Sequence, residues 1–346
     1  MGLRDTCGTL HENWYAACTS AELGTKKPLG RTILEEMLVV YRDMAGQPVA
    51  LIDRCLHRNA LLSEGDVFAG CIGCPYHGWT YNSQGQCVHI PSEGPERAIR
   101  PDKTLQSFPC MERDGLVWVY MGDPDNIRNE PFRMPFYKEK GWRSYYMITT
   151  FANGVTNLVE NFMDVPHTVF VHSKWFRNQT RTEGEALVTR TATSVEIEYF
   201  HQDSIGFTER ALNPKGLPMT HTDKFFMPNV TRVDYTYGDA RNFVISSQIT
   251  PVNQWESQVY TAIAFRFGWL NAIAEPFMRW YTRVVIEQDV RIMAIQSKAL
   301  KRYGPQFMST EADLVHEWIE SLRDYAECGE QGDAPVPAAK RIRFWI

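Results

Sequence analysis

Two patterns of apolar and polar positions divide the chain. Up to about residue 125, short alternating runs such as residues 37–43, 47–55 and 115–122 are separated by turns that contain glycine, proline and asparagine. Alternation between such turns is typical of β-strands that bury one face. The pattern therefore predicts an all-β domain over residues 1–125.

Beyond this point helical and strand-like patterns are mixed. A proline-containing segment without periodicity, residues 123–135, separates the two patterns, and we place the domain boundary there. The expected elements are a helix over 154–165, strands from 185 to about 268, a long helix over 275–303 that stops at Gly304-Pro305, and a last helix around 310–326. The chain is thus expected to be of the α+β class, with a second domain over residues 126–346.

Composition narrows the class of protein. The 346 residues are 44% hydrophobic and 22% charged, as expected for a globular protein with a core. The net charge of −5 leaves no basic stripe for nucleic acid. No signal-like start and no apolar run of about 20 residues is present, so we expect a cytoplasmic protein without a membrane span. The eight cysteines are then expected to be reduced thiols or metal ligands.

Four residues of the first domain form a metal-ligand pattern. Sixteen residues separate the pair Cys55 and His57 from the pair Cys74 and His77, so that each half has a thiol and an imidazole on a tight turn. Two thiolates on one iron and two imidazoles on the other are the ligands of a Rieske [2Fe–2S] cluster. Gly78 would let the backbone approach such a cluster closely.

A zinc site is the alternative for these ligands, because two cysteines and two histidines also bind zinc. Cys71 strengthens that alternative, since Cys71 and Cys74 have the spacing of a zinc knuckle. Zinc fingers, however, group cysteine with cysteine and histidine with histidine. We therefore favour the cluster, and expect the remaining cysteines to be buried thiols: Cys7, Cys18, Cys71, Cys87, Cys110 and Cys328.

A second group of ligand-type side chains interrupts the helix predicted at 154–165. Asn161 and Asp164 share one helical face with other polar residues, and His167 and His172 follow. Five residues do not return to the same helical face, so the two histidines converge only if the helix is broken. Pro166 favours a break because it biases the preceding residue away from helical angles.

Two imidazoles and one carboxylate form the facial triad that binds Fe(II) and leaves coordination positions open. Asp289 is the best candidate for the carboxylate, because it lies in an apolar stripe of the helix 275–303 together with Tyr281, Val285 and Met293. An unpaired carboxylate there would be costly. A buried, hydrogen-bonded acid without a metal is the alternative.

Taken together, the two constellations resemble the catalytic subunits of Rieske non-heme iron oxygenases over nearly the whole chain. The segments that carry the resemblance are NWYAACTSAEL at 13–23, CPYHGWTYNSQGQC at 74–87, ENFMDVPHTVFVH at 160–172 and EQDVRI at 287–292. Asn59 departs from the glycine that many members have in the first cluster loop, but asparagine tolerates positive φ.

The resemblance implies specific roles. His167, His172 and Asp289 would bind iron, and Asn161 would lie near it. Asp164 would bridge His167 to His77 of a neighbouring subunit and carry electrons from cluster to iron, which implies a head-to-tail homotrimer. The family's second domain wraps helices around an antiparallel sheet, in agreement with the strand-rich stretch from 185 to 268.

The implied activity is that of an oxygenase component, similar to vanillate-type demethylases. It would use O2 and electrons from a separate NAD(P)H-dependent reductase or a ferredoxin to hydroxylate or oxidatively demethylate a small organic, aromatic or cyclic substrate. No Gly-rich nucleotide motif is present, so NAD(P)H must be oxidised elsewhere. Aromatic cis-dihydroxylation is one alternative, and a non-enzymatic electron carrier or a zinc-stabilised binding protein is another.

The substrate pocket is not predictable in detail. Its walls are expected from residues 200–270 and the two iron helices, with no individual contacts named. The other histidines are expected on the surface or hydrogen-bonded in the core: His11, His89, His201, His221 and His316. Several aromatic residues are expected in the core rather than the pocket: Phe207, Phe225, Phe226, Tyr235, Phe243, Phe265 and Trp269.

Overall fold

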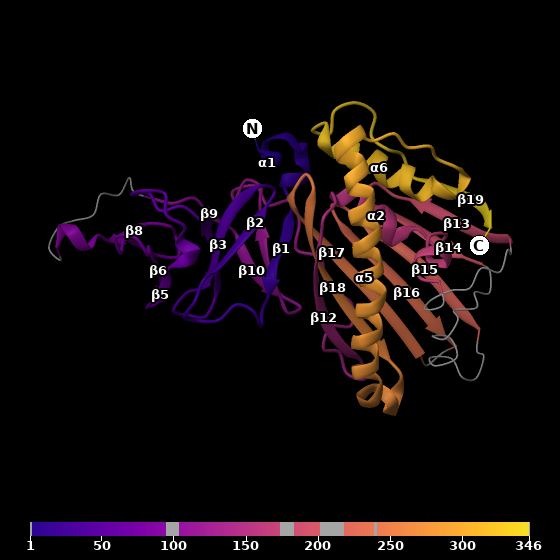
Figure 1. The fold of residues 1–346 in the computed structure, drawn as a ribbon, viewed down its shortest axis with the longest axis horizontal. Helices are drawn as coiled ribbons and strands as arrows, with labels where there is room; N and C mark the ends of the chain where they lie inside the picture. The colour runs from indigo at the N-terminus through magenta and orange to yellow at the C-terminus, as the bar shows by residue number, and fades with distance from the viewer. Residues whose placement is uncertain (1, 95–103, 174–182, 201–217, 239–240, 346) are drawn as a thin grey trace. The chain divides into compact units, whose positions relative to one another are not determined.

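The computed structural model describes residues 2–94, 104–173, 183–200, 218–238 and 241–345. His201 and Phe207 lie outside the described residues. The chain forms two compact units, Met1–Arg133 and Met134–Ile346. Their division falls within the proline-containing segment 123–135 (Figure 1).

The first unit is built from small antiparallel sheets. One sheet joins β1 (Trp14–Thr19), β11 (Leu116–Tyr120) and β10 (Cys110–Arg113); a second joins β2 (Leu29–Ile33), β3 (Glu36–Arg42), β4 (Pro48–Ile52) and β9 (Ser107–Phe108); a third joins β5 (Asp66–Phe68), β6 (Cys71–Gly73), β7 (Thr80–Tyr81) and β8 (Cys87–His89). The short helical turns are α1 (Leu3–Thr6), η1 (Gly8–His11), η2 (Leu62–Glu64) and η3 (Pro91–Glu93).

A single apolar cluster connects the second and third sheets. Tyr41 of β3, Leu51 of β4 and Ile72 of β6 are all buried in it, as alternation along each strand predicts. Cys55 and Cys74 belong to the same cluster. The core of this unit therefore supports the two loops that carry the first predicted ligands.

The second unit is organised around an eight-stranded antiparallel sheet. Its strand order is β12 (Arg143–Phe151), β18 (Glu256–Arg266), β17 (Arg241–Asn253), β16 (Val230–Tyr237), β15 (Met219–Phe226), β14 (Ser194–Tyr199), β13 (Glu183–Arg190) and β19 (Ala338–Trp345). The helices are α2 (Val155–Met163), α3 (Thr168–Val171), α5 (Asn271–Tyr303) and α6 (Leu314–Glu327), with short turns η4 (Gly268–Leu270) and η5 (Glu311–Asp313).

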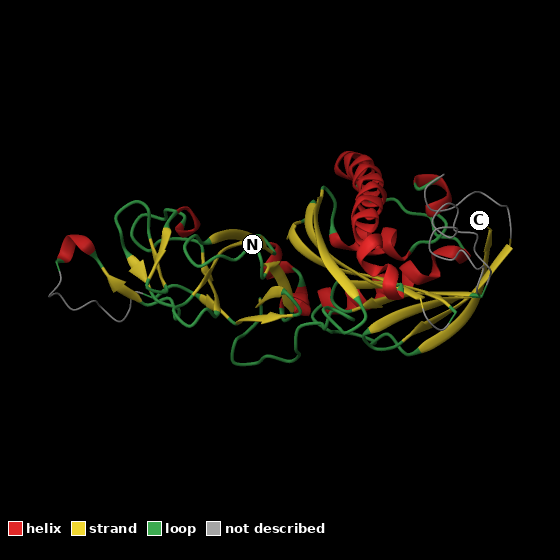
Figure 2. Ribbon diagram, turned by 90° about the horizontal axis from the view of Figure 1, so that it is seen from below, coloured by secondary structure: helices red, strands yellow, loops and turns green. Residues whose placement is uncertain are grey.

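The helices pack on one face of this curved sheet (Figure 2). Helix α2 contacts β15, β16 and β17, α5 contacts β12, and α6 contacts β13 and β14. A helix that buries one apolar stripe against a sheet is the arrangement that helical periodicity predicts. The expected antiparallel sheet with surrounding helices, and the all-β first domain, are both confirmed.

Four details differ from the sequence prediction. Trp269, which was expected in the core, is 82% exposed. Strand β19 was not predicted; it pairs with β13 at the sheet edge and buries Ile342 and Phe344 between charged residues. Helix α5 begins at Asn271, earlier than expected. Among the cysteines expected to be buried thiols, Cys328 is exposed, and Cys71 and Cys110 are half-buried.

No helix in the described ranges combines the length and the apolar character needed to cross a bilayer.

Candidate metal centres

The first ligand loop follows β4 and closes on its own backbone. The N–H of Cys55 donates to the carbonyl of Ala60 at 2.9 Å, and the carbonyl of Cys55 accepts from the N–H of Asn59 at 2.9 Å. Asn59 has a φ of 58°, as expected for a residue that replaces glycine in a tight turn. This closed turn holds His57 between the two bonded ends.

The second ligand loop, between β6 and β7, repeats the same hydrogen bonds. The N–H of Cys74 donates to Trp79 at 2.8 Å, and the carbonyl of Cys74 accepts from Gly78 at 3.0 Å. Gly78 has a φ of 72°, and a Cβ there would lie 2.9 Å from Cγ of Pro91. A glycine is therefore required here, both for its backbone angle and for space.

The two loops bring the four predicted ligands together. The imidazole rings of His57 and His77 have their centroids 4.5 Å apart, and His57 stacks on Trp79 at 4.9 Å. The two thiols are buried, Cys55 at 1% and Cys74 at 5% exposure, whereas His77 is exposed. Two sulfur donors inside and two nitrogen donors toward the surface fit a Rieske cluster.

Hydrogen-bonding groups lie close to both cysteine sulfur atoms. Burial raises the pKa of the Cys74 thiol, while backbone N–H groups of Tyr76 and His77 act in the opposite direction. The hydroxyl of Tyr81 lies 3.2 Å from Sγ of Cys55. Hydrogen bonds to the ligand sulfur atoms are one means by which a protein tunes such a cluster.

The second centre begins where α2 ends. Asp164 follows the last helical residue with extended angles, φ −95° and ψ 111°, so the chain turns before Pro166 as predicted. His167 then caps the start of α3, and His172 caps its end. One short helical turn thus separates two histidines that a continuous helix would have pointed apart.

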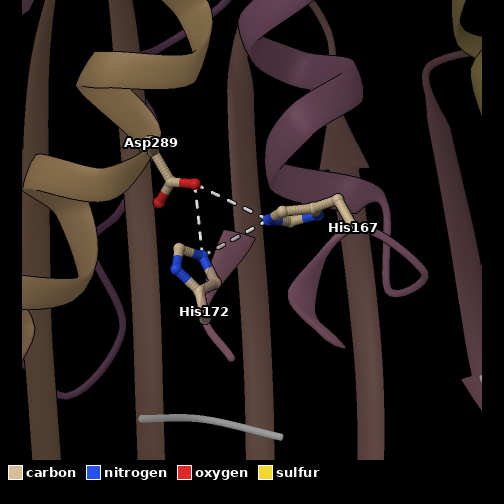
Figure 3. Close-up of side chains that lie close together, drawn as sticks. All are labelled: His167, His172 and Asp289. Carbon is tan, nitrogen blue, oxygen red and sulfur yellow. Dashed lines mark hydrogen bonds and ion pairs between the residues drawn. The ribbon is translucent and has the colours of Figure 1, made fainter. Parts of the chain in front are cut away.

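Asp289 of α5 meets these two histidines (Figure 3). Its Oδ1 lies 3.2 Å from Nε2 of His172 and 3.6 Å from Nε2 of His167, and the two Nε2 atoms are 3.3 Å apart. Asp289 is 5% and His172 3% exposed. Among the described residues, these three are the one group of histidine, cysteine or acidic side chains whose ligand atoms all lie within 4.8 Å of one another.

Hydrogen bonds of the Nδ1 atoms fix the tautomers of His167 and His172. Nδ1–H of His167 donates to the backbone carbonyl of Asp164, and Nδ1–H of His172 donates to Oε1 of Gln288 at 2.8 Å. Because both acceptors are oxygens, each Nε2 is left with a lone pair that points at the other ligands. Gln288 was not predicted; its only sequence signal is that it precedes Asp289.

Charge at the centre calls for a cation. Burial opposes ionisation of Asp289, but its hydrogen bonds and charge interactions with His167 and His172 lower its pKa to about 2. Burial likewise disfavours a charged His167, yet Asp164 and Asp289 raise its pKa to about 9. Three close donor atoms need either a proton or a metal ion between them, so the set fits a divalent iron.

Asn161 and Asp164 also lie at this centre. The amide of Asn161 on α2 donates to Oδ1 of Asp289 at 3.2 Å. The carboxylate of Asp164 accepts from the backbone N–H of His167 at 3.1 Å, and its Oδ2 is 3.5 Å from Nδ1 of the same residue. The side chain of Asp164 is 34% exposed, so it alone of this group reaches toward solvent.

A cavity of about 120 Å³ opens onto the three ligands. Its other walls are mostly apolar. The sheet contributes Met147, Val233, Ile245 and Ile263, and helix α5 contributes Val285 and Ile286. Tyr235 and Phe243 are buried, as predicted, but they line the cavity as well. The same wall contains His221 and Asp223, which the sequence did not identify as pocket residues.

Comparisons with known proteins match the two units of the chain to two separate domain families. Residues 13–109 match the Rieske [2Fe-2S] domain, and residues 154–316 match the vanillate O-demethylase oxygenase C-terminal domain. The first match includes Cys55 and Cys74 with their histidines, and the second includes His167 and His172 together with Asp289.

Relatives are similar over part of their length. The oxygenase component of dicamba O-demethylase from Stenotrophomonas maltophilia is 39% identical over 162 residues, 46% of each chain. Aminopyrrolnitrin oxygenase from Pseudomonas fluorescens is 33% identical over 177 residues, 50% of this chain and 48% of that protein. The chain thus spans about half the length of the curated relatives it matches.

Solved structures share the fold over almost the whole chain. Dicamba monooxygenase bound to dicamba superposes with a TM-score of 0.82 at 23% identity, covering 93% of this chain and 99% of that one. A Pseudomonas putida NdmA variant with theobromine gives 0.80 at 22% identity, covering 97% and 98%. With its Rieske [2Fe–2S] domain followed by a vanillate O-demethylase-type oxygenase domain, the chain belongs to the Rieske non-heme iron oxygenases.

Proposed function

We propose that this protein is the oxygenase component of a multi-component system, which hydroxylates or oxidatively demethylates a small organic substrate with O2. The observation that carries the proposal is the position of His167, His172 and Asp289, whose ligand atoms converge at the wall of a largely apolar cavity. A site open to a cavity serves chemistry on a bound molecule, whereas a structural metal site is closed by protein ligands.

Each of the seven proposed ligands has a defined place. Cys55, His57, Cys74 and His77 would hold the [2Fe–2S] cluster, and His167, His172 and Asp289 the mononuclear Fe(II). When bound, these groups supply one-electron transfer and O2 activation, which protein side chains do not provide.

The protein's own contribution is orientation and exclusion of water. Gln288 and the carbonyl of Asp164 hold the two imidazoles in one tautomer, and Asn161 holds the carboxylate of Asp289. Supporting hydrogen bonds of this kind fix ligand geometry before a metal arrives. The apolar cavity walls position an organic substrate beside the ligands and leave little room for bulk water.

The proposal includes a head-to-tail homotrimer in which Asp164 bridges two subunits. His77 is exposed on the first unit, and the side chain of Asp164 is 34% exposed beside His167. These exposures leave both side chains accessible to a neighbouring copy, where Asp164 would hydrogen-bond to His167 of its own chain and to His77 of the next.

An Asp164→Ala variant tests this bridge. We expect it to retain both metal groups but to lose at least about tenfold in substrate-dependent turnover, because the connection between the two histidines is removed. A variant with full metal content and full turnover would contradict the bridge. The mass of the assembly in solution tests the trimer separately.

The proposed partners and substrates follow from the family. Several relatives are named as components, which supports a separate reductase or ferredoxin as electron donor. Dicamba O-demethylase and chloroacetanilide N-alkylformylase are named for removal of groups from oxygen or nitrogen, which favours demethylation or hydroxylation over cis-dihydroxylation. An aromatic or cyclic substrate of modest size fits the cavity volume of about 120 Å³.

Metal and sulfide analysis of the anaerobically purified protein, with an EPR spectrum after dithionite reduction, tests the proposal. We expect about three irons and about two sulfides per chain. About two irons that do not increase after Fe(II) is added would instead indicate an electron carrier. Zinc without sulfide would replace the cluster by a zinc site and overturn the proposed function.

A further inference from the structure

A buried histidine–aspartate pair forms part of the cavity wall, on a strand that carries none of the proposed ligands. His221 and Asp223 lie two residues apart on β15, so both side chains emerge on the same face of the strand. Nε2–H of His221 donates to Oδ1 of Asp223 at 2.8 Å. The two side chains are 3% and 2% exposed, and both line the cavity that contains His167, His172 and Asp289.

The imidazole of His221 is held by its neighbours across the sheet. Tyr199 of β14 and Tyr235 of β16 are its direct cross-strand partners. Their rings stack on the imidazole with centroid distances of 4.5 Å and 4.4 Å and interplanar angles of 20° and 21°. An imidazole stacked on both faces cannot rotate freely, so the direction of its bond to Asp223 is set by the sheet.

Asp223 has more hydrogen-bonding capacity than the described structure uses. A carboxylate offers about four acceptor positions. Among the residues that the structure describes, His221 is the only side chain that hydrogen-bonds to Asp223. A buried carboxylate with one partner is costly for stability, and such a residue in a cavity wall is characteristic of a ligand site.

We propose that the His221–Asp223 pair positions the substrate by accepting a hydrogen bond from a hydroxyl or amino group. This inference rests on the proposed oxygenase function and adds the class of substrate. In it, Asp223 contacts the substrate, and His221 is a positioning residue that orients the carboxylate.

The rest of the cavity favours the same class. An ionised carboxylate accepts hydrogen bonds and repels anions, so a carboxylate or sulfonate on the substrate would be disfavoured beside Asp223. The described residues that line the cavity include no lysine or arginine to offset that repulsion. The apolar wall formed by Val233, Ile245 and Ile263 suits a hydrocarbon frame around the single polar group.

Binding of four single-ring compounds to the anaerobic, iron-loaded protein tests this proposal. Phenol and aniline carry a donor, anisole carries only an acceptor, and benzoate is anionic. Dissociation constants from NMR titration should be at least about tenfold lower for phenol or aniline than for anisole and benzoate. Tighter binding of phenol would identify a hydroxyl as the substrate's donor, and tighter binding of aniline an amino group.

Three variants separate recognition from structure. Asp223→Leu should abolish the preference for donor compounds, and Asp223→Asn should reduce it. Thr222→Val is the matched control, since Thr222 lies between the pair on the opposite face of β15 and should retain the preference. If Asp223 had a purely structural role, its substitution would weaken the binding of all four compounds equally.

Two results would overturn the proposal. One is wild-type protein that binds anisole or benzoate as tightly as phenol and aniline, which needs no variant to fold. The other is a folded Asp223→Asn or Asp223→Leu protein with unchanged preference. Line broadening of bound compounds by paramagnetic iron reports the metal independently: preference without broadening would contradict the iron site alone, and broadening without preference would contradict the pair alone.

Discussion

The two proposed metal centres differ in how far apart their ligands lie in the sequence. The four proposed cluster ligands lie within residues 55–77, on two loops with the same internal hydrogen bonds around Cys55 and Cys74. The proposed mononuclear site combines a short segment, His167 to His172, with Asp289 from a helix more than a hundred residues later.

The difference extends to how each centre is supported. In the first, backbone bonds within each loop set the ligand positions, and His77 remains exposed. In the second, side chains from other elements do so, with Gln288 on His172 and Asn161 on Asp289. A local centre depends on turn geometry, whereas a distributed centre depends on correct packing of α2 and α5.

The largest expected effect is loss of the cluster without loss of the second centre. Cys55→Ser should remove nearly all acid-labile sulfide, because a thiolate ligand is missing. Cys71→Ser is the matched control, since Cys71 is half-buried near Cys74 but is not a proposed ligand. Sulfide and iron assays on both variants measure this. Equal sulfide loss in both would show that the cluster requires Cys71 as well, and would contradict the proposed set of four ligands.

The converse change should remove the mononuclear iron alone. Asp289→Ala is expected to lower product formation by more than about 100-fold while the cluster EPR signal persists. Glu287→Ala serves as control, because Glu287 is exposed on the same helix. If Asp289→Ala kept its iron and activity, Asp289 would be the buried, hydrogen-bonded acid of the alternative interpretation.

A smaller effect is expected from the support of His172. Gln288→Leu removes the acceptor for Nδ1 of that histidine and should weaken Fe(II) binding about 10–100-fold, with the cluster unchanged. The control is Gln296→Leu, since Gln296 lies on the same helix as Gln288 but accepts a hydrogen bond from Asn153, which is not a proposed ligand. Fe(II) titration of both proteins gives the affinities, and equal affinities would show that Gln288 does not orient the ligand.

The smallest effect should appear in the stability of the cluster loops. Gly78→Ala places a Cβ at positive φ and 2.9 Å from Pro91, and should lower the free energy of unfolding by about 1–2 kcal/mol. Asn59→Gly, at the equivalent position with φ 58°, should change it by less than about 0.5 kcal/mol. Urea titrations followed by cluster absorbance compare the two, and similar midpoints would contradict the need for glycine at residue 78.

Local patterns predicted much of this structure. Alternation predicted the strands around residues 37–43 and 115–122, and the helical period predicted α2 and most of α5. Pro166 predicted the break that lets His167 and His172 converge. These features depend on backbone preferences within a few residues, which neighbouring side chains largely determine.

Features that depend on distant pairing were missed. Strand β19 becomes a strand because β13 offers an open edge, and its charged residues obscure the alternation. Tyr235 and Phe243 were predicted only as core, and His221 as a surface or hydrogen-bonded core residue. Burial of these residues was predictable from their type, but which cavity they line depends on how the sheet curves under the helices.

The sequence by itself predicted the two sets of proposed ligands, the order of the two domains and the α+β class, because ligand spacing and hydrophobic period are local properties. Only the tertiary structure decided that Gln288 and Asn161 hold the ligands, and that His221 and Asp223 share a cavity with them. Those relations join segments far apart in the chain, and they are set by the register of the strands and the packing of helices on the sheet.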